Sequence, residues 1–208
     1  DAAEHAMGLS RAGFSVEPRK VDVASSADVQ SIRKHIENEY GRVDVLINNA
    51  GIFIEKGEGA EADAANCEDP LRISTTTVMQ TFNVNTMGAM RLIQALAPLM
   101  PSGGRIINVS SALGQFNAGQ GLEIHGNFLG YRMSKSALNM LTCVYADALR
   151  ERGIVVNAMS PGWVRTDMGG PNGERTIEEG IDTIVWLASS PEAQETGGFY
   201  RDRERVAW

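Results

Sequence analysis

Val45-Leu-Ile-Asn-Asn-Ala-Gly51 decides the fold, because a short apolar run passes there directly into two amides and a glycine. A short apolar run bounded by turn-forming residues is typical of a buried strand. The same form returns at Arg105-Ile-Ile-Asn-Val109 and at Ile154-Val-Val-Asn-Ala158, each followed within two residues by serine. Segments with helical periodicity separate these runs, so the order predicts βαβ units and a parallel sheet covered on both faces.

The segments between the strands have recognisable helix starts and stops. Ser25 and Asp28 resemble a capping box, and Gly41 ends the helix that they open. The remaining elements predicted from the pattern are a helix that ends near Gly13, a strand at Val16–Val23, helices at about Thr75–Leu99 and Tyr131–Arg152, and a helix opened by the capping box Thr176-Ile-Glu-Glu179.

Tyr131-Arg-Met-Ser-Lys135 carries the chemistry, because it places a phenol and an ammonium group four positions apart on a predicted helix. Side chains at that spacing lie on one face, one turn apart. A lysine near a tyrosine favours the phenolate, which predicts a Tyr131 pKa below the usual value of about 10. Taken alone, however, such a pair is more often solvated.

Two further polar groups fall where a site would form. Ser111 follows the strand at 105–109, and ligands bind at the carboxyl ends of the strands in open α/β sheets. Asn85 lies on the apolar face of the helix predicted at Thr75–Leu99. A buried amide needs hydrogen-bond partners, so Asn85 is either a structural tie or part of the site.

Composition and charge exclude several classes of protein. The chain has 208 residues, 43% of them hydrophobic, which is enough for one globular domain with a packed core. A net charge of −7, without a basic run, argues against a nucleic-acid partner. Cys67 and Cys143 lack CxxC spacing and the histidines are scattered, so neither a disulfide framework nor a metal site is predicted. The sequence has neither a signal peptide nor a bilayer-spanning run, which predicts a cytoplasmic protein without a membrane partner.

Four motifs in order make the chain resemble the short-chain dehydrogenase/reductase family. They are Asn48-Asn-Ala-Gly51, Ser111, Tyr131 to Lys135, and Pro161 to Thr166, and together they span most of the chain. The tail, from Pro161 to Trp208, is most similar to the carbonyl-reductase branch. The resemblance implies a doubly wound, Rossmann-like single domain over residues 1–208. It also implies hydride transfer between a nicotinamide cofactor and a small-molecule carbonyl or secondary alcohol, most simply carbonyl reduction.

By this resemblance the catalytic residues are Asn85, Ser111, Tyr131 and Lys135. Tyr131 would exchange a proton with the substrate oxygen, and Ser111 would hydrogen-bond the same oxygen. Lys135 would lower the pKa of Tyr131 and hold the nicotinamide ribose, while Asn85 would position a water in the proton path.

The resemblance also assigns cofactor contacts along the chain. Asp22 and Val23 would meet the adenine, Asn49 the adenosine ribose, and Val164 and Thr166 the nicotinamide amide. Tyr131 and Lys135 would contact the cofactor as well. The likeness to carbonyl reductases favours NADP, with NAD as the alternative, because the residues that usually decide between them belong to a segment absent from this sequence.

Three departures from the family pattern qualify the prediction. The glycine-rich turn and its β-α-β unit are absent, so the sequence predicts a domain lacking its first strands, which would fold poorly by itself. Ser111 and Tyr131 are 20 positions apart, so Gly119–Gly126 should form a loop beside the substrate. Thr166 and Thr176 are only 10 apart, which predicts a reduced lid and an open site.

Two other readings remain open. A catalytically inactive, Rossmann-like binding or regulatory module would explain the missing glycine-rich turn, although it has no use for four intact catalytic residues. A dehydratase or epimerase of the extended branch is disfavoured by the short chain after Pro161. The resemblance also allows a homo-oligomer.

Overall fold

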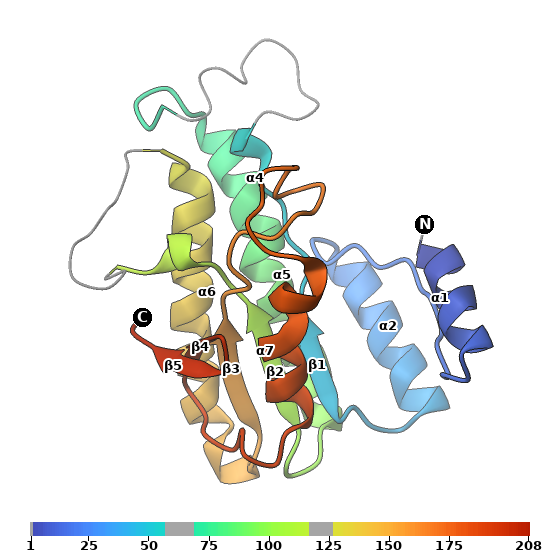
Figure 1. The fold of residues 1–208 in the computed structure, drawn as a ribbon. Helices are drawn as coiled ribbons and strands as arrows, with labels where there is room; N and C mark the ends of the chain where they lie inside the picture. The colour runs from blue at the N-terminus through green and yellow to red at the C-terminus, as the bar shows by residue number, and fades with distance from the viewer. Residues whose placement is uncertain (1, 57–68, 117–126) are drawn as a thin grey trace.

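The computed structural model describes residues 2–56, 69–116 and 127–208, and it has a twisted sheet with helices on both faces (Figure 1). Neighbouring strands follow the order β1-β2-β3-β4-β5, in which the first four run parallel and the last is antiparallel. The strands are β1 Val45–Asn48, β2 Arg105–Val109, β3 Val155–Met159, β4 Phe199–Arg201 and β5 Glu204–Val206. The predicted doubly wound α/β fold is confirmed.

Helices connect the parallel strands and cover the sheet. The described helices are α1 Ala2–Arg11, α2 Ser26–Glu39, α4 Thr75–Asn85, α5 Met87–Leu96, α6 Leu129–Ala148 and α7 Ile177–Ser189, with short 3-10 turns η1 Ile54–Lys56, η2 Ala97–Leu99, η3 Ala112–Gly114 and η4 Arg150–Arg152. In the described part of the chain, no helix is long and apolar enough to cross a membrane.

Neighbouring residues of β2 show how the sheet is covered. Ile106 belongs to an apolar cluster with residues of α2, α5 and α6, whereas Ile107 belongs to a second cluster with Leu187 of α7. Successive side chains of a strand point to opposite faces, so each cluster fills one layer of the fold. Figure 1 shows α7 on one face of the sheet and α5 and α6 on the other.

The predicted helix caps are present. The Thr176 hydroxyl accepts a hydrogen bond from the Glu179 amide, and the Glu179 carboxylate accepts one from the Thr176 amide, so this capping box is complete. Ser25 caps α2 through the Asp28 amide, but the Asp28 carboxylate accepts from the Asp22 amide and the Ser25 hydroxyl instead of closing the box.

Two predicted elements are wrong in detail. The strand predicted at Val16–Val23 is absent, because no described strand lies beside this segment to complete a ladder of backbone hydrogen bonds. Glu17 of this segment instead accepts hydrogen bonds from the side chains of Tyr40 and His35 on the neighbouring helix and turn. The helix predicted at Thr75–Leu99 is also interrupted at Thr86, whose hydroxyl donates to the Ser134 carbonyl oxygen of α6 at 2.8 Å.

Candidate active site

Tyr131, Ser111 and Lys135 meet at the carboxyl end of β2. Ser111 lies two residues beyond the strand, and the first turns of α6 carry Tyr131 and Lys135. The Ser111 hydroxyl lies beside the Tyr131 phenol and acts to lower the pKa of that phenol. The Lys135 ammonium lies 5.5 Å from the centroid of the Tyr131 ring and donates to the Val109 carbonyl oxygen at 2.8 Å. The structure therefore brings three of the four predicted catalytic side chains together.

Burial controls the protonation of this group. Tyr131 is 7% exposed and Lys135 is 5% exposed. Burial raises the pKa of Tyr131 to about 12, although the neighbouring Ser111 hydroxyl acts in the opposite direction. Burial lowers the pKa of Lys135 to about 8. The predicted lowering of the Tyr131 pKa is therefore wrong: burial of the phenol outweighs the effect of the Ser111 hydroxyl, and the Lys135 ammonium bonds to a backbone carbonyl.

The side chain of Asn85, the fourth predicted residue, is hydrogen-bonded to two neighbouring segments. Its Nδ2 donates to the Ile52 carbonyl oxygen and to the Ser134 hydroxyl, both at 3.0 Å. Its Oδ1 accepts from the Ile52 amide at 2.8 Å. A Cβ on Gly51 would lie 3.4 Å from this Oδ1 and 3.6 Å from the Lys135 Nζ, so Asn85 borders the site. The side chain thus joins the segment after β1 to α6.

The predicted adenine contacts lie in the turn before α2. Asp22 is exposed, and its carboxylate accepts from the Ala24 amide at 2.8 Å. Val23 lies so close to Gly88 of α5 that a Cβ there would come within 2.7 Å of its Cγ2. The Arg91 guanidinium also donates to the Val23 carbonyl oxygen at 3.3 Å. Helix α5 therefore fixes this turn at the edge of the fold.

The other predicted cofactor contacts follow β1 and β3. Asn49 is exposed directly after β1. Val164 packs against Gly180 of α7, where a Cβ would come within 2.6 Å of the valine Cγ2. The Thr166 hydroxyl accepts from the Gly169 amide at 3.1 Å. The short segment between Thr166 and Thr176, where a reduced lid was predicted, consists mainly of turns and bends.

Several buried polar side chains that hold the site were missed. Asn48 Nδ2 donates to Asn108 Oδ1 at 2.8 Å, and Asn108 Nδ2 donates to the Thr142 hydroxyl at 2.9 Å. The Ser110 hydroxyl donates to Asn139 Oδ1 at 2.6 Å. The amides at the ends of apolar strands were the available signal, but their partners are distant in sequence. Cys67, His125 and the loop predicted at Gly119–Gly126 lie outside the described residues.

Comparison with known proteins decides the family. The sequence matches the family described as short chain dehydrogenase over residues 1–177. The chain belongs to the short-chain dehydrogenase family. It is 29% identical to "Carbonyl reductase [NADPH] 1" of Mus musculus, over 96% of this chain and 82% of that protein. It is 30% identical to "Short-chain dehydrogenase anuI" of Penicillium roqueforti, over 95% of this chain and 77% of that protein.

Solved structures of short-chain dehydrogenases have the same fold. The NADPH-bound carbonyl reductase from chicken fatty liver superposes with a TM-score of 0.81 at 26% identity, covering 99% of this chain and 82% of that one. The recognised family, and its likeness to carbonyl reductases, are thereby confirmed. The chain is an oxidoreductase of the short-chain dehydrogenase type with a Rossmann-like fold.

Proposed function

We propose that this short-chain dehydrogenase reduces a carbonyl group of a small molecule with NADPH. The observation that carries the proposal is the buried Tyr131 phenol, with the Ser111 hydroxyl beside it and the Lys135 ammonium 5.5 Å from its ring centroid. At neutral pH a phenol with a pKa of about 12 is fully protonated, which suits a proton donor in reduction. The likeness to carbonyl reductases named for NADPH supports the choice of cofactor over NAD.

The residues at the carboxyl edge of the sheet fit a nicotinamide dinucleotide. A buried ammonium and two hydroxyls form a donor set that suits ribose hydroxyls and a carbonyl oxygen, and Gly51 keeps side-chain atoms away from Lys135. In this proposal Lys135 holds the nicotinamide ribose, and Val164 and Thr166 hold the nicotinamide amide. Asp22 and Val23 bind the adenine, while Asn49 binds the adenosine ribose.

The protein residues carry the proton and hold the substrate oxygen. When bound, the reduced nicotinamide supplies the hydride for the carbonyl carbon. Tyr131 gives its phenolic proton to the carbonyl oxygen, and the Ser111 hydroxyl donates a hydrogen bond to that oxygen as charge develops. The Lys135 ammonium then stabilises the tyrosinate left behind. Asn85 positions a water in the path that restores the proton.

The test is consumption of NADPH with a panel of small and bulky carbonyl compounds, comparing the wild-type protein with Tyr131→Phe. We expect turnover in the wild type and its loss in the variant, with NADPH binding retained in both. A wild-type protein that binds NADPH but turns over neither the carbonyls nor the matching alcohols would instead be the inactive binding module. The cytoplasmic location and a homo-oligomer remain predictions.

A further inference from the structure

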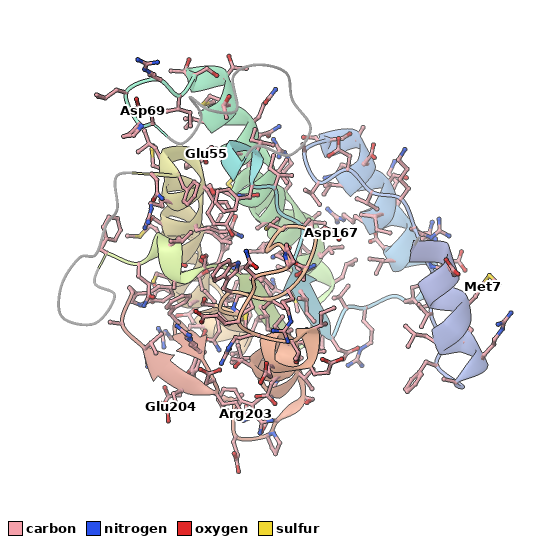
Figure 2. All side chains as sticks on the ribbon, turned by 45° about the horizontal axis from the view of Figure 1, so that its top comes forward. Met7, Glu55, Asp69, Asp167, Arg203 and Glu204 are labelled. Carbon is pink, nitrogen blue, oxygen red and sulfur yellow. The ribbon has the colours of Figure 1, made fainter. Side chains whose placement is uncertain are left out.

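Glu55 is a completely buried carboxylate at the start of the helix that carries Tyr131. It belongs to η1, and its side chain has 0% exposed surface. Figure 2 marks Glu55 in this turn, which lies against α4. Its Oε1 accepts from the Gly130 amide at 2.9 Å, and its Oε2 accepts from the Tyr131 amide at 2.6 Å. A carboxylate distant in sequence thus binds the backbone of the catalytic tyrosine itself.

Helix α6 needs this partner because it has no cap of its own. The first amides of a helix lack intrahelical acceptors, and an N-cap side chain normally accepts from the second or third. The N-cap residue of α6 is Phe128, which has no capping group and adopts the left-handed conformation at φ 58°. Gly130 and Tyr131 are the second and third helical residues, so Glu55 supplies the acceptors that a local cap would supply.

The segment before Glu55 also contacts Tyr131 and Asn85. The Phe53 ring stacks on the Tyr131 ring, with centroids 4.1 Å apart and an interplanar angle of 18°. The Ile52 backbone is bonded at both its amide and its carbonyl to the Asn85 side chain. Residues 52–55 therefore connect the two proposed catalytic residues through one short stretch of chain.

We propose that Glu55 is a positioning residue, whose carboxylate fixes the first turn of α6 and thereby holds the Tyr131 phenol at its distance from the substrate oxygen. This inference rests on the proposed function of Tyr131 as proton donor. Gly130 contributes because a Cβ there would lie 3.2 Å from the Val78 Cα and 3.3 Å from the Glu55 Oε2, so a larger residue would crowd the carboxylate. Charge-assisted bonds to backbone amides are strong and directional, which suits this role.

The test compares Glu55→Gln and Glu55→Asp with a control that loses stability elsewhere. In Glu55→Gln an amide donor faces a backbone N–H, so one of the two bonds is lost. We expect kcat to fall about 10- to 100-fold, as for a displaced catalytic group, while the Kd of NADPH is unchanged. Glu55→Asp keeps both acceptors on a shorter stem, so its kcat should lie between those of the wild type and Glu55→Gln. The control is Ile154→Val or Ile154→Ala, whichever matches the loss in Tm, since Ile154 is buried before β3, away from the site.

A second measurement, carbon NMR of protein with isotope-labelled tyrosine, does not depend on activity. The chemical shift of the Tyr131 Cζ should change in Glu55→Gln and stay the same in the Ile154 control. Wild-type kcat in both Glu55 variants, or a drop in the control equal to that in Glu55→Gln, would overturn the inference. If the wild type reduces no carbonyl, the proposed function fails, and the Cζ signal alone decides whether Glu55 positions the phenol. If Glu55→Gln does not fold, Glu55→Asp decides by the same two measurements.

Discussion

Replacing Lys135 by methionine should change how the stability of the protein depends on pH. Burial lowers the pKa of Lys135 from 10.5 to about 8. A base with a folded pKa below its unfolded pKa binds its proton less tightly in the folded state. The protonated lysine therefore lowers the free energy of unfolding at low pH. The cost is complete below about pH 8 and disappears as the pH rises through 10.5. Methionine keeps the length of the side chain but removes the charge.

The size of the effect follows from the two pKa values. A shift from 10.5 to about 8 corresponds to about 3 kcal/mol of lost stability at pH 7. By linkage the same cost falls below about 1 kcal/mol at pH 10. Loss of the hydrogen bond from Lys135 to the Val109 carbonyl oxygen adds an offset that does not vary with pH. The stability of Lys135→Met relative to the wild type should therefore decrease by about 2 kcal/mol between pH 7 and pH 10.

Urea unfolding of both proteins at several pH values between 7 and 10 measures this difference. The range stops at pH 10 because Tyr131, with its pKa raised to about 12, destabilises the folded state above that pH. A difference in unfolding free energy that stays constant across the range would refute the burial of a charged Lys135. In the same variant, NADPH titration and kinetics should show a higher Kd as well as a lower kcat. A change in kcat alone would contradict the proposed ribose contact.

Three further substitutions test the site and its support. Tyr131→Phe should lower the rate of carbonyl reduction about 10²-fold or more with little change in NADPH affinity, and wild-type turnover would exclude Tyr131 as the proton donor. Gly114→Ala should destabilise by about 1–3 kcal/mol and lower kcat, because its Cβ would lie 2.7 Å from the Lys135 backbone and displace the turn that carries Ser111; an unchanged Tm would contradict that packing. Thr142→Val removes the acceptor of Asn108 Nδ2 and should cost about 1–3 kcal/mol in urea unfolding, whereas Thr142→Ser should cost much less.

The sequence predicted the elements that local pattern specifies. Apolar runs ending in polar residues located β1, β2 and β3, and the Thr176 capping box located the start of α7. Local pattern could not locate what depends on a distant partner. The apolar residues at Val16–Val23 satisfy the strand pattern, but a strand also needs a neighbour. The break at Thr86 depends on a bond to Ser134, which is 48 residues away.

The relative positions of Tyr131 and Lys135 could be predicted from the sequence, but the electrostatics around them could not. The spacing of Tyr131 and Lys135 correctly placed both on one face of a helix. Spacing does not reveal how deeply that face is buried, nor that the ammonium bonds to the Val109 carbonyl oxygen. Burial decides the direction of the Tyr131 pKa shift. Glu55 was missed because its partners are backbone amides 75 and 76 residues away, which carry no side-chain signature.

The polar contacts between α6 and its neighbours limit the positions that this helix can take relative to the sheet. Apolar contacts between packed elements tolerate small displacements, because the hydrophobic effect has no preferred direction. Hydrogen bonds lose strength steeply with distance and angle. Two such hydrogen bonds join β2 and the residue after it to different turns of α6. They run from Asn108 to Thr142 and from Ser110 to Asn139. A shift of α6 by one residue along its axis would break both hydrogen bonds together. The two bonds therefore hold Tyr131 at a single position along the helix axis instead of an average over several.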